Sequence, residues 1–208
     1  MKITNSKDEM IENQLILRGI SNKKVIEAFR SVPREYFVRK EDSNKAYIDS
    51  ALPIECGQTI SQPYIVALMV ELIDPKKNDT IVEIGSGCGY MVAILSCIVE
   101  KVYGVEIENE LVNISKKNLE KINANNVEIK YEDGKELFSF EKESIDKIII
   151  SAATKEIPKE WIEVLKEEGK IVVPIDKNNY QTIKVYVKKE NKLVEIYESF
   201  PVRFVKLR

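Results

Sequence analysis

Three glycines at alternate positions, Gly85, Gly87 and Gly89, form the part of this sequence best suited to hold a ligand. They follow the short apolar run 81–84, which contains Glu83, and they lead into an apolar pattern with helical spacing. Glycine is required where the backbone takes a positive φ angle or lies against a ligand without room for a Cβ atom. The free N–H groups at the start of the following helix point toward the same place. A strand, a tight turn and a helix in this order predict a cofactor site.

Two acids further along the chain indicate which cofactor. The dinucleotide fingerprint is GxGxxG with an acid about twenty residues later, whereas the glycines here are spaced GxGxG. Glu106 ends the next apolar run, where its carboxylate can accept hydrogen bonds from both ribose hydroxyls; Asp133 ends the third, where it can take an adenine amino group. This spacing, with Glu83 before the turn, is typical of S-adenosylmethionine-dependent methyltransferases. The predicted cofactor-binding residues here are Glu83, Gly85, Ser86, Gly87, Gly89, Glu106, Ile107, Asp133 and Gly134.

Each of these features by itself also has a purely structural interpretation. A glycine-rich turn can be an ordinary corner between a strand and a helix, Glu106 can be a solvated acid, and Asp133-Gly134 can be a simple turn. The cofactor prediction depends on all three lying at the carboxyl ends of successive strands. Open α/β sheets bind their ligands at that edge.

The residue inventory excludes several kinds of chemistry. The 208-residue chain has no histidine, which excludes Ser-His-Asp and Cys-His nucleophilic machinery and the usual zinc sites, so we expect no metal. Its net charge of −2, without a cluster of Lys and Arg, argues against a nucleic-acid partner. Cys56, Cys88 and Cys97 form no CxxC pair, and no secretory signal or apolar run of membrane length is visible. These features predict a reduced, cytoplasmic protein without membrane contact, in which Cys56 and Cys88 are small fillers rather than nucleophiles.

Apolar strands and amphipathic helices alternate from residue 80 onward and must position these side chains. The alternation predicts an α/β fold: a doubly wound, mostly parallel, seven-stranded Rossmann-like sheet with helices on both faces. An N-terminal helical extension precedes it, and a C-terminal antiparallel hairpin is added to it. The expected strands are 80–84, 101–105, 127–131, 146–151 and 170–174, the helices between them are 91–98, 110–122 and 158–165, and the hairpin strands are 182–188 and 193–200.

The region before residue 80 contains helices and one long loop. Two short helices are expected in the first forty residues; Ser21 is predicted to cap the second and Pro33 to end it. Residues 47–63 follow neither period, and loops of this length are often functional. A helix is expected over 65–73. We expect the whole chain to form one methyltransferase domain: N-terminal helices and active-site loop in 1–75, cofactor-binding core in 76–175, and hairpin in 176–208.

The loop sequence is more specific than the glycine turn. Its run Gly57-Gln58-Thr59-Ile60-Ser61-Gln62-Pro63 resembles the family of protein-L-isoaspartate O-methyltransferases, which carries a Gly-Gln-Thr-Ile-Ser-(Gln/Ala)-Pro loop before a helix. The resemblance extends over nearly the whole chain through the matching segments 32–38, 46–49, 83–89, 151–153, 157–158 and 202–205.

This resemblance implies methyl transfer from S-adenosylmethionine to the side-chain carboxylate of L-isoaspartyl residues in damaged proteins. S-adenosyl-L-homocysteine is the other product, and the methyl ester then collapses to a succinimide that reopens partly as normal aspartate. A monomeric enzyme is expected. In that family the serine of the loop, here Ser61, is the active-site residue, and Thr59 and Ser61 flank the cofactor. The substrate side is implied to consist of Ile60, Ser61, Ser151, Ala152 and Ala153.

The absence of histidine is compatible with this reaction. A carboxylate with a pKa of about 4 is already anionic at neutral pH, so it can attack a methyl group without giving up a proton. No general base is then required. Catalysis would come mostly from positioning, and the hydroxyl of Ser61 can donate one orienting hydrogen bond.

Several alternatives stay open. Ser61 could merely cap the following helix, and Arg34 and Arg203 are interpreted as solvated surface cations outside the site. The same fold could serve a different acceptor, such as an aspartate in one particular peptide or an RNA base. A non-catalytic relative that binds a cofactor is a third possibility.

The sequence also departs from the family pattern at some positions. Glu55 and Lys155 are expected at the mouth of the substrate cleft, where their charges would change which peptides enter. The full set of departures is Ala51, Glu55, Thr154-Lys155, Asp176 and Lys206.

Overall fold

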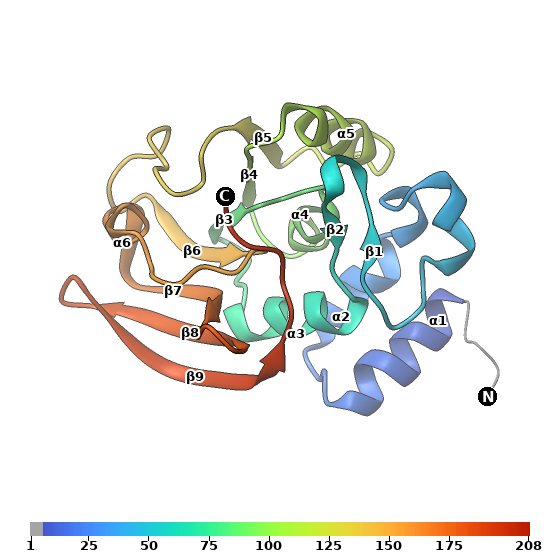
Figure 1. Ribbon diagram of the computed structural model, residues 1–208, viewed down its shortest axis with the longest axis horizontal. Coiled ribbons are helices and arrows are strands. Elements are labelled where there is room, and N and C mark those ends of the chain that lie inside the picture. The colour runs from blue at the N-terminus through green and yellow to red at the C-terminus, as the bar shows by residue number, and fades with distance from the viewer. Residues whose placement is uncertain (1–5) are drawn as a thin grey trace.

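A seven-stranded sheet forms the centre of the computed structural model, which describes residues 6–208 (Figure 1). Residues 1–5, the start of the predicted N-terminal part, lie outside the described residues. The strands of this sheet are β3 (Thr80–Ile84), β4 (Lys101–Glu106), β5 (Val127–Tyr131), β6 (Ile145–Ile150), β7 (Leu165–Asp176), β8 (Gln181–Lys189) and β9 (Lys192–Val202).

The strand order across the sheet is β5-β4-β3-β6-β7-β8-β9. The first five strands pair in parallel, and β8 is antiparallel to both of its neighbours. The predicted mostly parallel sheet with an antiparallel C-terminal hairpin is therefore confirmed. The order β7-β8-β9 at the end of the sheet is new information, because strand order is not encoded in hydrophobic periodicity.

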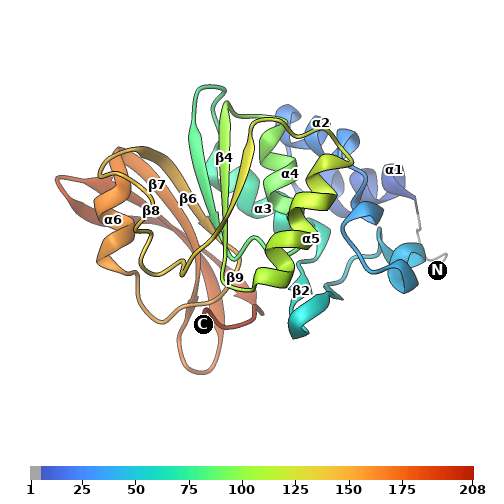
Figure 2. The same ribbon diagram turned by 90° about the horizontal axis from the view of Figure 1, so that it is seen from above.

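Helices cover both faces of the sheet, as predicted, but unequally. Helices α3 (Pro63–Ile73), α4 (Tyr90–Ser96) and α5 (Asn109–Glu120) lie on one side, and α6 (Lys159–Val164) lies on the other (Figure 2). Leu137 and Phe140, from the loop after β5, complete the cover beside α6. The face with three helices consequently carries the larger hydrophobic core.

Successive residues of the parallel strands point into the two cores alternately. In β6, Ile149 packs in the larger core, whereas Ile148 and Ile150 pack in the core under α6. Because such strands are buried on both faces, they appear in the sequence as continuous apolar runs. That pattern locates the strands but does not reveal which face each residue occupies.

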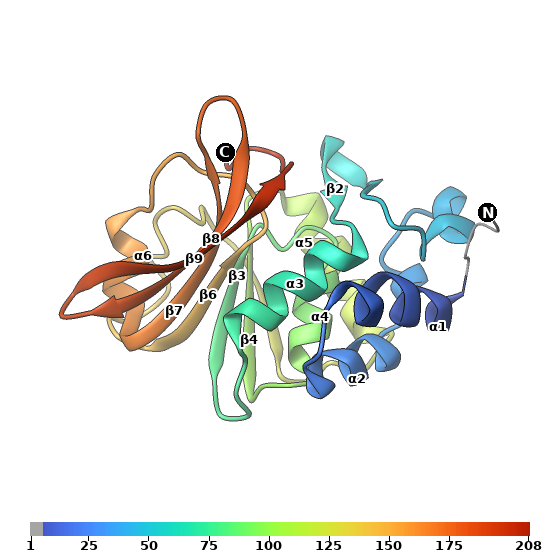
Figure 3. The same cartoon turned by 90° about the horizontal axis from the view of Figure 1, so that it is seen from below.

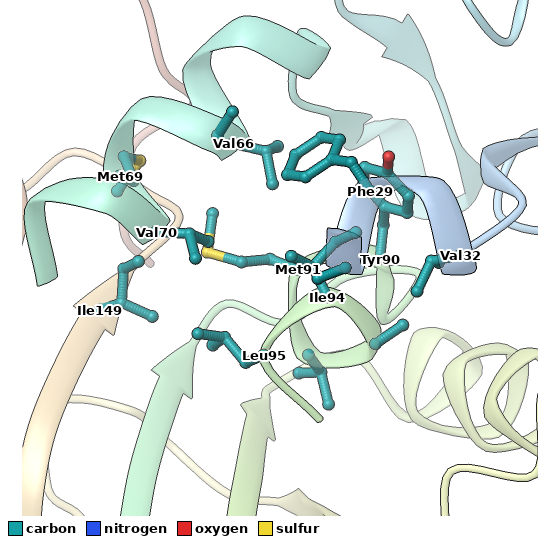
Figure 4. Packing of buried hydrophobic residues seen from close by; sticks show 14 of the residues in the cluster. Phe29, Val32, Val66, Met69, Val70, Tyr90, Met91, Ile94, Leu95 and Ile149 are labelled. Carbon is teal, nitrogen blue, oxygen red and sulfur yellow. The ribbon is translucent and has the colours of Figure 1, made fainter. Parts of the chain in front are cut away.

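The N-terminal helices pack on α3 and α4 rather than on the sheet (Figure 3). The first is a continuous helical stretch consisting of α1 (Lys7–Glu9), a π-helical turn (Met10–Leu15) and a 3₁₀ turn (Ile16–Arg18); the second is α2 (Lys23–Ser31). Phe29 of α2 lies edge-on to Tyr90 of α4, with 6.1 Å between the ring centroids (Figure 4). These helices thus support the start of α4 from the side opposite the sheet.

The predicted cap of α2 is wrong by one residue. Asn22, not Ser21, is the N-cap: its Oδ1 accepts a hydrogen bond from Lys24 N at 3.0 Å. The N–H of Ser21 instead donates to Glu71 Oε1 of α3 at 2.8 Å. The N–H of Asn22 also donates to Glu71 Oε1, at 2.6 Å, so both residues contact α3 through their backbone, which the local sequence does not show.

The long loop before α3 contains a small antiparallel hairpin of β1 (Leu52–Pro53) and β2 (Thr59–Ile60), separate from the main sheet. Helix α3 begins at Pro63, two residues earlier than expected, because proline is favourable at the first position of a helix. Among residues 6–208, no helix is long and apolar enough to cross a membrane.

Candidate active site

The glycine turn connects the end of β3 to α4 and is anchored to the neighbouring strand. The N–H groups of Gly85 and Ser86 both donate to Val105 O of β4, at 2.8 and 3.2 Å. Gly85 and Gly87 take positive φ angles of 77° and 53°. A Cβ atom on Gly85 would meet no protein atom closer than 3.9 Å, so this glycine is required by its backbone conformation rather than by crowding.

Glu106 lies at the end of β4 and is buried beside this turn. Its Oε2 accepts a hydrogen bond from Gly87 N at 2.8 Å, and its Oε1 accepts one from Glu108 N at 3.0 Å. Two backbone N–H groups therefore hold the carboxylate in place. Each oxygen keeps a lone pair for a further donor, as binding a pair of ribose hydroxyls requires.

Glu83 lies under the turn and is fully buried. Ser151 Oγ, at the end of β6, donates to Glu83 Oε1 at 2.6 Å, while Oε2 has no partner within residues 6–208. Burial raises the pKa of Glu83 to about 8, and the Ser151 hydrogen bond opposes part of that shift. A buried carboxylate with one free oxygen at a cavity wall can accept a hydrogen bond from a ligand, an ammonium group included.

A cavity lies above the turn and is lined by most of the predicted cofactor residues. Gly89 and Asp133 do not line it. The αL-configured Gly89 faces α5, where a Cβ atom would lie 3.1 Å from Ser115 Cβ. Asp133 Oδ1 accepts a hydrogen bond from Lys135 N at 2.9 Å within a turn. The predicted residues that do line the cavity are Thr59, Ile60, Ser61, Glu83, Gly85, Ser86, Gly87, Glu106, Ile107, Gly134, Ser151 and Ala152.

A second cavity, which we call the acceptor groove, opens beside the first. It lies between the loop before α3 and the segment after β9, and its cationic lining residues are Arg18, Arg203 and Lys206. Among the described residues that line the groove, none is acidic. Five residues line both cavities and mark where they meet: Thr59, Ser61, Ser151, Val205 and Lys206.

Ser61 lies at this junction, and it is not a helix cap. The N-cap residue of α3 is Gln62, and no side chain forms a capping hydrogen bond there. Within residues 6–208, the hydroxyl of Ser61 forms no hydrogen bond, which leaves it available to a ligand. Of the other predicted substrate-side residues, Ser151 lines both cavities, Ile60 and Ala152 line only the cofactor cavity, and Ala153 lines neither.

The C-terminal segment contributes a wall that sequence reasoning missed. Val205 O accepts a hydrogen bond from Ala153 N, and Leu207 N donates to Ala153 O, both at 2.8 Å. Arg208 Nη2 then lies 2.6 Å from Glu108 Oε1. The segment 202–205 matched the family pattern, but no motif indicated that it would fold back over the carboxyl ends of the strands.

Arg34 is the clearest correction to the sequence analysis. It was interpreted as a solvated surface cation, yet its side chain is 0% exposed. Its Nη2 donates to Ser61 O and its Nε to Ala46 O, each at 2.8 Å. Sequence alone gave no sign of burial, because the local pattern around Val32-Pro33-Arg34 is short and irregular.

Cys88 and two charged residues that differ from the family pattern, Glu55 and Lys155, do not lie where the cofactor cavity and the acceptor groove meet. Burial raises the pKa of the Cys88 thiol to about 12, which agrees with its interpretation as a filler. Glu55 pairs with Arg39 at 3.6 Å, and neither Glu55 nor Lys155 lines either cavity. No group of three or more potential metal ligands occurs in the part of the chain that the structure describes.

The residues around the first cavity fit S-adenosylmethionine. Its lining combines a buried acid held by two backbone N–H groups, Glu106, with the apolar Ile107, the small Gly134, and Glu83, whose Oε2 has no partner among the described residues. Such a set can bind hydroxyls, a flat base and an ammonium group, the three parts of this cofactor. A cavity with this donor set, at the carboxyl ends of β3 and β4 in a seven-stranded sheet, defines a class I S-adenosylmethionine-dependent methyltransferase.

Comparison with known proteins identifies the family within that class. The family model for protein-L-isoaspartate(D-aspartate) O-methyltransferase matches residues 5–208, and the chain belongs to this family. It is 43% identical over 187 residues to protein-L-isoaspartate O-methyltransferase 2 of Nitrosococcus oceani, covering 89% of this chain and 84% of the relative. It is 40% identical over 206 residues to the Vibrio campbellii enzyme of the same family name, covering 99% and 97%.

Solved structures agree with the fold. A protein-L-isoaspartate O-methyltransferase structure superposes with a TM-score of 0.86 at 28% identity, covering 97% of this chain and 65% of the other. A Plasmodium falciparum structure described under the same enzyme name, in complex with S-adenosyl-L-homocysteine, gives a TM-score of 0.85 at 25% identity and covers 99% of each chain.

Proposed function

We propose that this protein transfers a methyl group from S-adenosylmethionine to the side-chain carboxylate of L-isoaspartyl residues in damaged proteins and so initiates their repair. Membership of the protein-L-isoaspartate(D-aspartate) O-methyltransferase family supports the reaction. The lining of the two cavities supports the roles of the individual residues.

The observation that supports this proposal most strongly is that the cofactor cavity and the acceptor groove join. The charged residues that line the groove are all cations; within residues 6–208, Arg203 and Lys206 form no ion pair, whereas Arg18 pairs with Asp49 at 2.8 Å. The cofactor cavity has acids as well as cations in its lining: Glu83, Glu106, Lys206 and Arg208. Opposite charge attracts an anionic acceptor into the groove and positions it beside the donor's cavity. Ser61 and Ser151 lie where the two spaces join.

S-adenosylmethionine supplies an activated methyl group when it is bound. The protein's task is then to hold a carboxylate oxygen in line with that methyl group and to exclude misaligned acceptors. Ser61 donates a hydrogen bond to one carboxylate oxygen and leaves the other oxygen free to react. Glu106 and the glycine turn hold the donor, and Val205 and Lys206 form the opposite wall. No proton has to be removed, which explains how a site without histidine can operate.

Paired peptides test the function. A synthetic isoaspartyl peptide should accept labelled methyl from S-adenosylmethionine as a base-labile ester, and the matching aspartyl peptide should not. Equal labelling of both peptides would contradict the repair function and leave a methyltransferase of broader acceptor range. Labelling of RNA but of neither peptide would support the alternative acceptor.

The role of Ser61 is tested by Ser61→Ala. We expect kcat on the isoaspartyl peptide to fall about tenfold to a hundredfold, the range that lost positioning can produce. The dissociation constant for S-adenosylmethionine should change little. Ser50→Ala is the matched control, because Ser50 lies in the same loop and its hydroxyl contacts only Ala51 O, at 3.1 Å. Unchanged turnover in Ser61→Ala would remove Ser61 from the catalytic site.

The proposed oligomeric state, partners and cellular compartment of the enzyme follow from the sequence. Residues 1–208 act as one methyltransferase domain and as a monomer on protein substrates, without nucleic acid, in the cytoplasm. The three cysteines are unpaired, in keeping with a reducing compartment. Light scattering of the purified enzyme, with and without substrate, tests the monomer.

A further inference from the structure

The charge of Arg34 is completely buried and needs a physical explanation. Removing a guanidinium group from water is costly, and buried cations in proteins are normally paired with a carboxylate. Within residues 6–208, Arg34 forms no ion pair with any acid. Burial lowers its pKa, and Tyr90 opposes that shift. A free energy cost of this kind persists only where the surrounding contacts offset it.

Two backbone carbonyls and one aromatic ring provide those contacts. Arg34 donates through Nε to Ala46 O and through Nη2 to Ser61 O, each at 2.8 Å. Its guanidinium carbon lies 4.7 Å from the ring centroid of Tyr90. A planar guanidinium can make two divergent hydrogen bonds and stack on a ring at the same time, and lysine cannot. The residue therefore joins three segments that are distant in the sequence.

Each of those segments has a place in the site. Ser61 is the proposed active-site residue, and Ala46 precedes the loop that contains it. Tyr90 is the first residue of α4, directly after the glycine turn, and it lines the cofactor cavity. Tyr90 is itself fixed by Phe29, visible beside it in Figure 4, and by Phe37, with ring centroids 5.4 Å apart. The guanidinium thus spans the distance between the acceptor loop and the cofactor turn.

Within residues 6–208, the Arg34 contact is the one side-chain hydrogen bond to the backbone of Ser61, although its neighbour Gln62 donates to Asp49 Oδ1 at 2.6 Å. The hairpin that precedes Ser61 pairs only Leu52 with Ile60 and Pro53 with Thr59. Its own side chain does not cap α3. A shift of about 1 Å in a positioning group can cost about a hundredfold in rate, so the contact that holds this carbonyl can influence catalysis without touching substrate.

We propose that Arg34 is a positioning residue, which holds the backbone of Ser61 at a fixed distance from the cofactor turn by bonding its carbonyl while stacking on Tyr90. This inference rests on the proposed function, since it acts through Ser61. It predicts that loss of Arg34 lowers the rate of methyl transfer while cofactor binding is retained.

Two substitutions of Arg34 and one control test this role. Arg34→Lys keeps the charge but replaces the planar guanidinium with a single ammonium nitrogen that cannot bond the carbonyls and stack on Tyr90 in the same geometry, and Arg34→Met keeps only the length of the side chain. With kcat expressed per folded molecule, from a urea unfolding curve of the same preparation, we expect kcat to fall about tenfold in Arg34→Lys and about a hundredfold in Arg34→Met. The dissociation constant for S-adenosylmethionine should stay within about threefold in Arg34→Lys. Arg30→Met is the matched control, because Arg30 is partly exposed and pairs with Glu12 on the surface.

A double-mutant cycle separates positioning from a general structural role. If Arg34 acts through Ser61, Arg34→Lys should lower kcat by less than about twofold when Ser61 is already alanine. A kcat of Arg34→Lys within twofold of wild type overturns the inference, and so do losses that multiply in the double variant. If Arg34→Met does not fold at the assay temperature, Arg34→Lys and the cycle still decide. A wild-type enzyme inactive on isoaspartyl peptide contradicts the proposed function instead, and full activity of Ser61→Ala removes the serine's role together with this inference.

Discussion

The glycine turn and the acceptor loop form opposite sides of one site, but they are held in place in different ways. The turn is bonded to the next strand through Gly85 N and Ser86 N, and Asn118 of α5 holds it through Cys88 O at 3.1 Å. The loop has a two-residue hairpin and depends on side chains from elsewhere, above all Arg34. Secondary structure positions the donor side, and tertiary contacts position the acceptor side.

Each side also buries one ionisable group, and the two groups differ in how they are satisfied. Glu83 has one hydrogen bond from Ser151 and one oxygen without a partner among the described residues. Arg34 donates to two backbone carbonyls and stacks on a ring, and its Nη1 is likewise buried without a partner among the described residues. The difference lies in their partners: Glu83 has one hydrogen bond, from a side chain at a cavity wall, and is suited to meet a ligand, whereas Arg34 is bonded twice to main chain and is suited to hold the fold. Four tests compare the donor side with the acceptor side, from the largest expected effect to the smallest.

The largest effect should come from Glu83→Gln, measured as the free energy of urea unfolding between pH 4 and pH 9. The pKa of Glu83 is raised from 4.5 to about 8 in the folded protein. Between these values the unfolded chain has released the proton and the folded chain keeps it, so stability from this group falls as pH rises through the window. At about 1.4 kcal/mol per pKa unit, wild type should lose several kcal/mol relative to Glu83→Gln across that range. The difference should be constant above pH 8.

Glu110→Gln, on the exposed surface of α5, serves as the control and should give a curve parallel to wild type. Parallel curves for wild type and Glu83→Gln would mean that Glu83 is ionised in the folded protein. In that case the contrast between the two buried groups would lose its electrostatic basis.

Glu106→Ala should weaken S-adenosylmethionine binding about tenfold to a hundredfold, because hydrogen bonds to a charged group contribute about 1.5–3 kcal/mol. Titration calorimetry measures this directly. The turnover at saturating cofactor should change much less, in contrast to Ser61→Ala. If Glu106→Ala kept its normal affinity for S-adenosylmethionine but lost turnover, Glu106 would act in methyl transfer and not in cofactor binding.

The same change, glycine to alanine, should have unequal effects on the two sides. At Gly134, beside the end of β3, a Cβ atom would lie 2.3 Å from Ile84 Cγ2 in the core, and overpacking of this kind costs about 1–3 kcal/mol. At Gly57 in the acceptor loop, φ is 67° and no atom lies within 4 Å, so only backbone strain of about 1 kcal/mol is expected. Thermal unfolding should therefore show the larger loss for Gly134→Ala. Equal losses would show that the acceptor loop at Gly57 is as tightly constrained as the donor side at Gly134.

Arg203→Ala in the acceptor groove should have the smallest effect. An exposed cation contributes about 0–1 kcal/mol, so KM for an isoaspartyl peptide should rise about twofold to fivefold while kcat stays unchanged. The rise should shrink as salt is added. Lys155→Ala, which lines neither cavity, should match wild type. If Lys155→Ala raises KM instead, the expected position of Lys155 at the cleft mouth would be restored.

The donor side was largely predictable from the sequence for a local reason. Glu83, Gly85, Gly87 and Glu106 sit at the ends of apolar runs, and periodicity locates such ends within a residue or two. Asp133 lies two residues beyond the end of β5 at Tyr131, and its carboxylate bonds within its own turn. Its contact with adenine stays a prediction.

The acceptor side was predictable only through the resemblance of its Thr59-Ile60-Ser61 run to a known family. Composition and spacing gave no indication that Arg34 would be buried under it, or that Val205 and Lys206 would return to its edge. Those contacts join residues far apart in the chain, and no local pattern encodes them.

The sequence by itself therefore determined the alternation of strands and helices, the turn that receives the donor and the absence of imidazole chemistry. These depend on side-chain type and on spacing over a few residues. Only the tertiary structure decided that Ser61 is free of its helix, that Arg34 holds its backbone, and that the end of the chain closes the site. The physical reason is that a buried charge or a free hydroxyl is defined by what surrounds it in space, and those neighbours are brought together only when the chain folds.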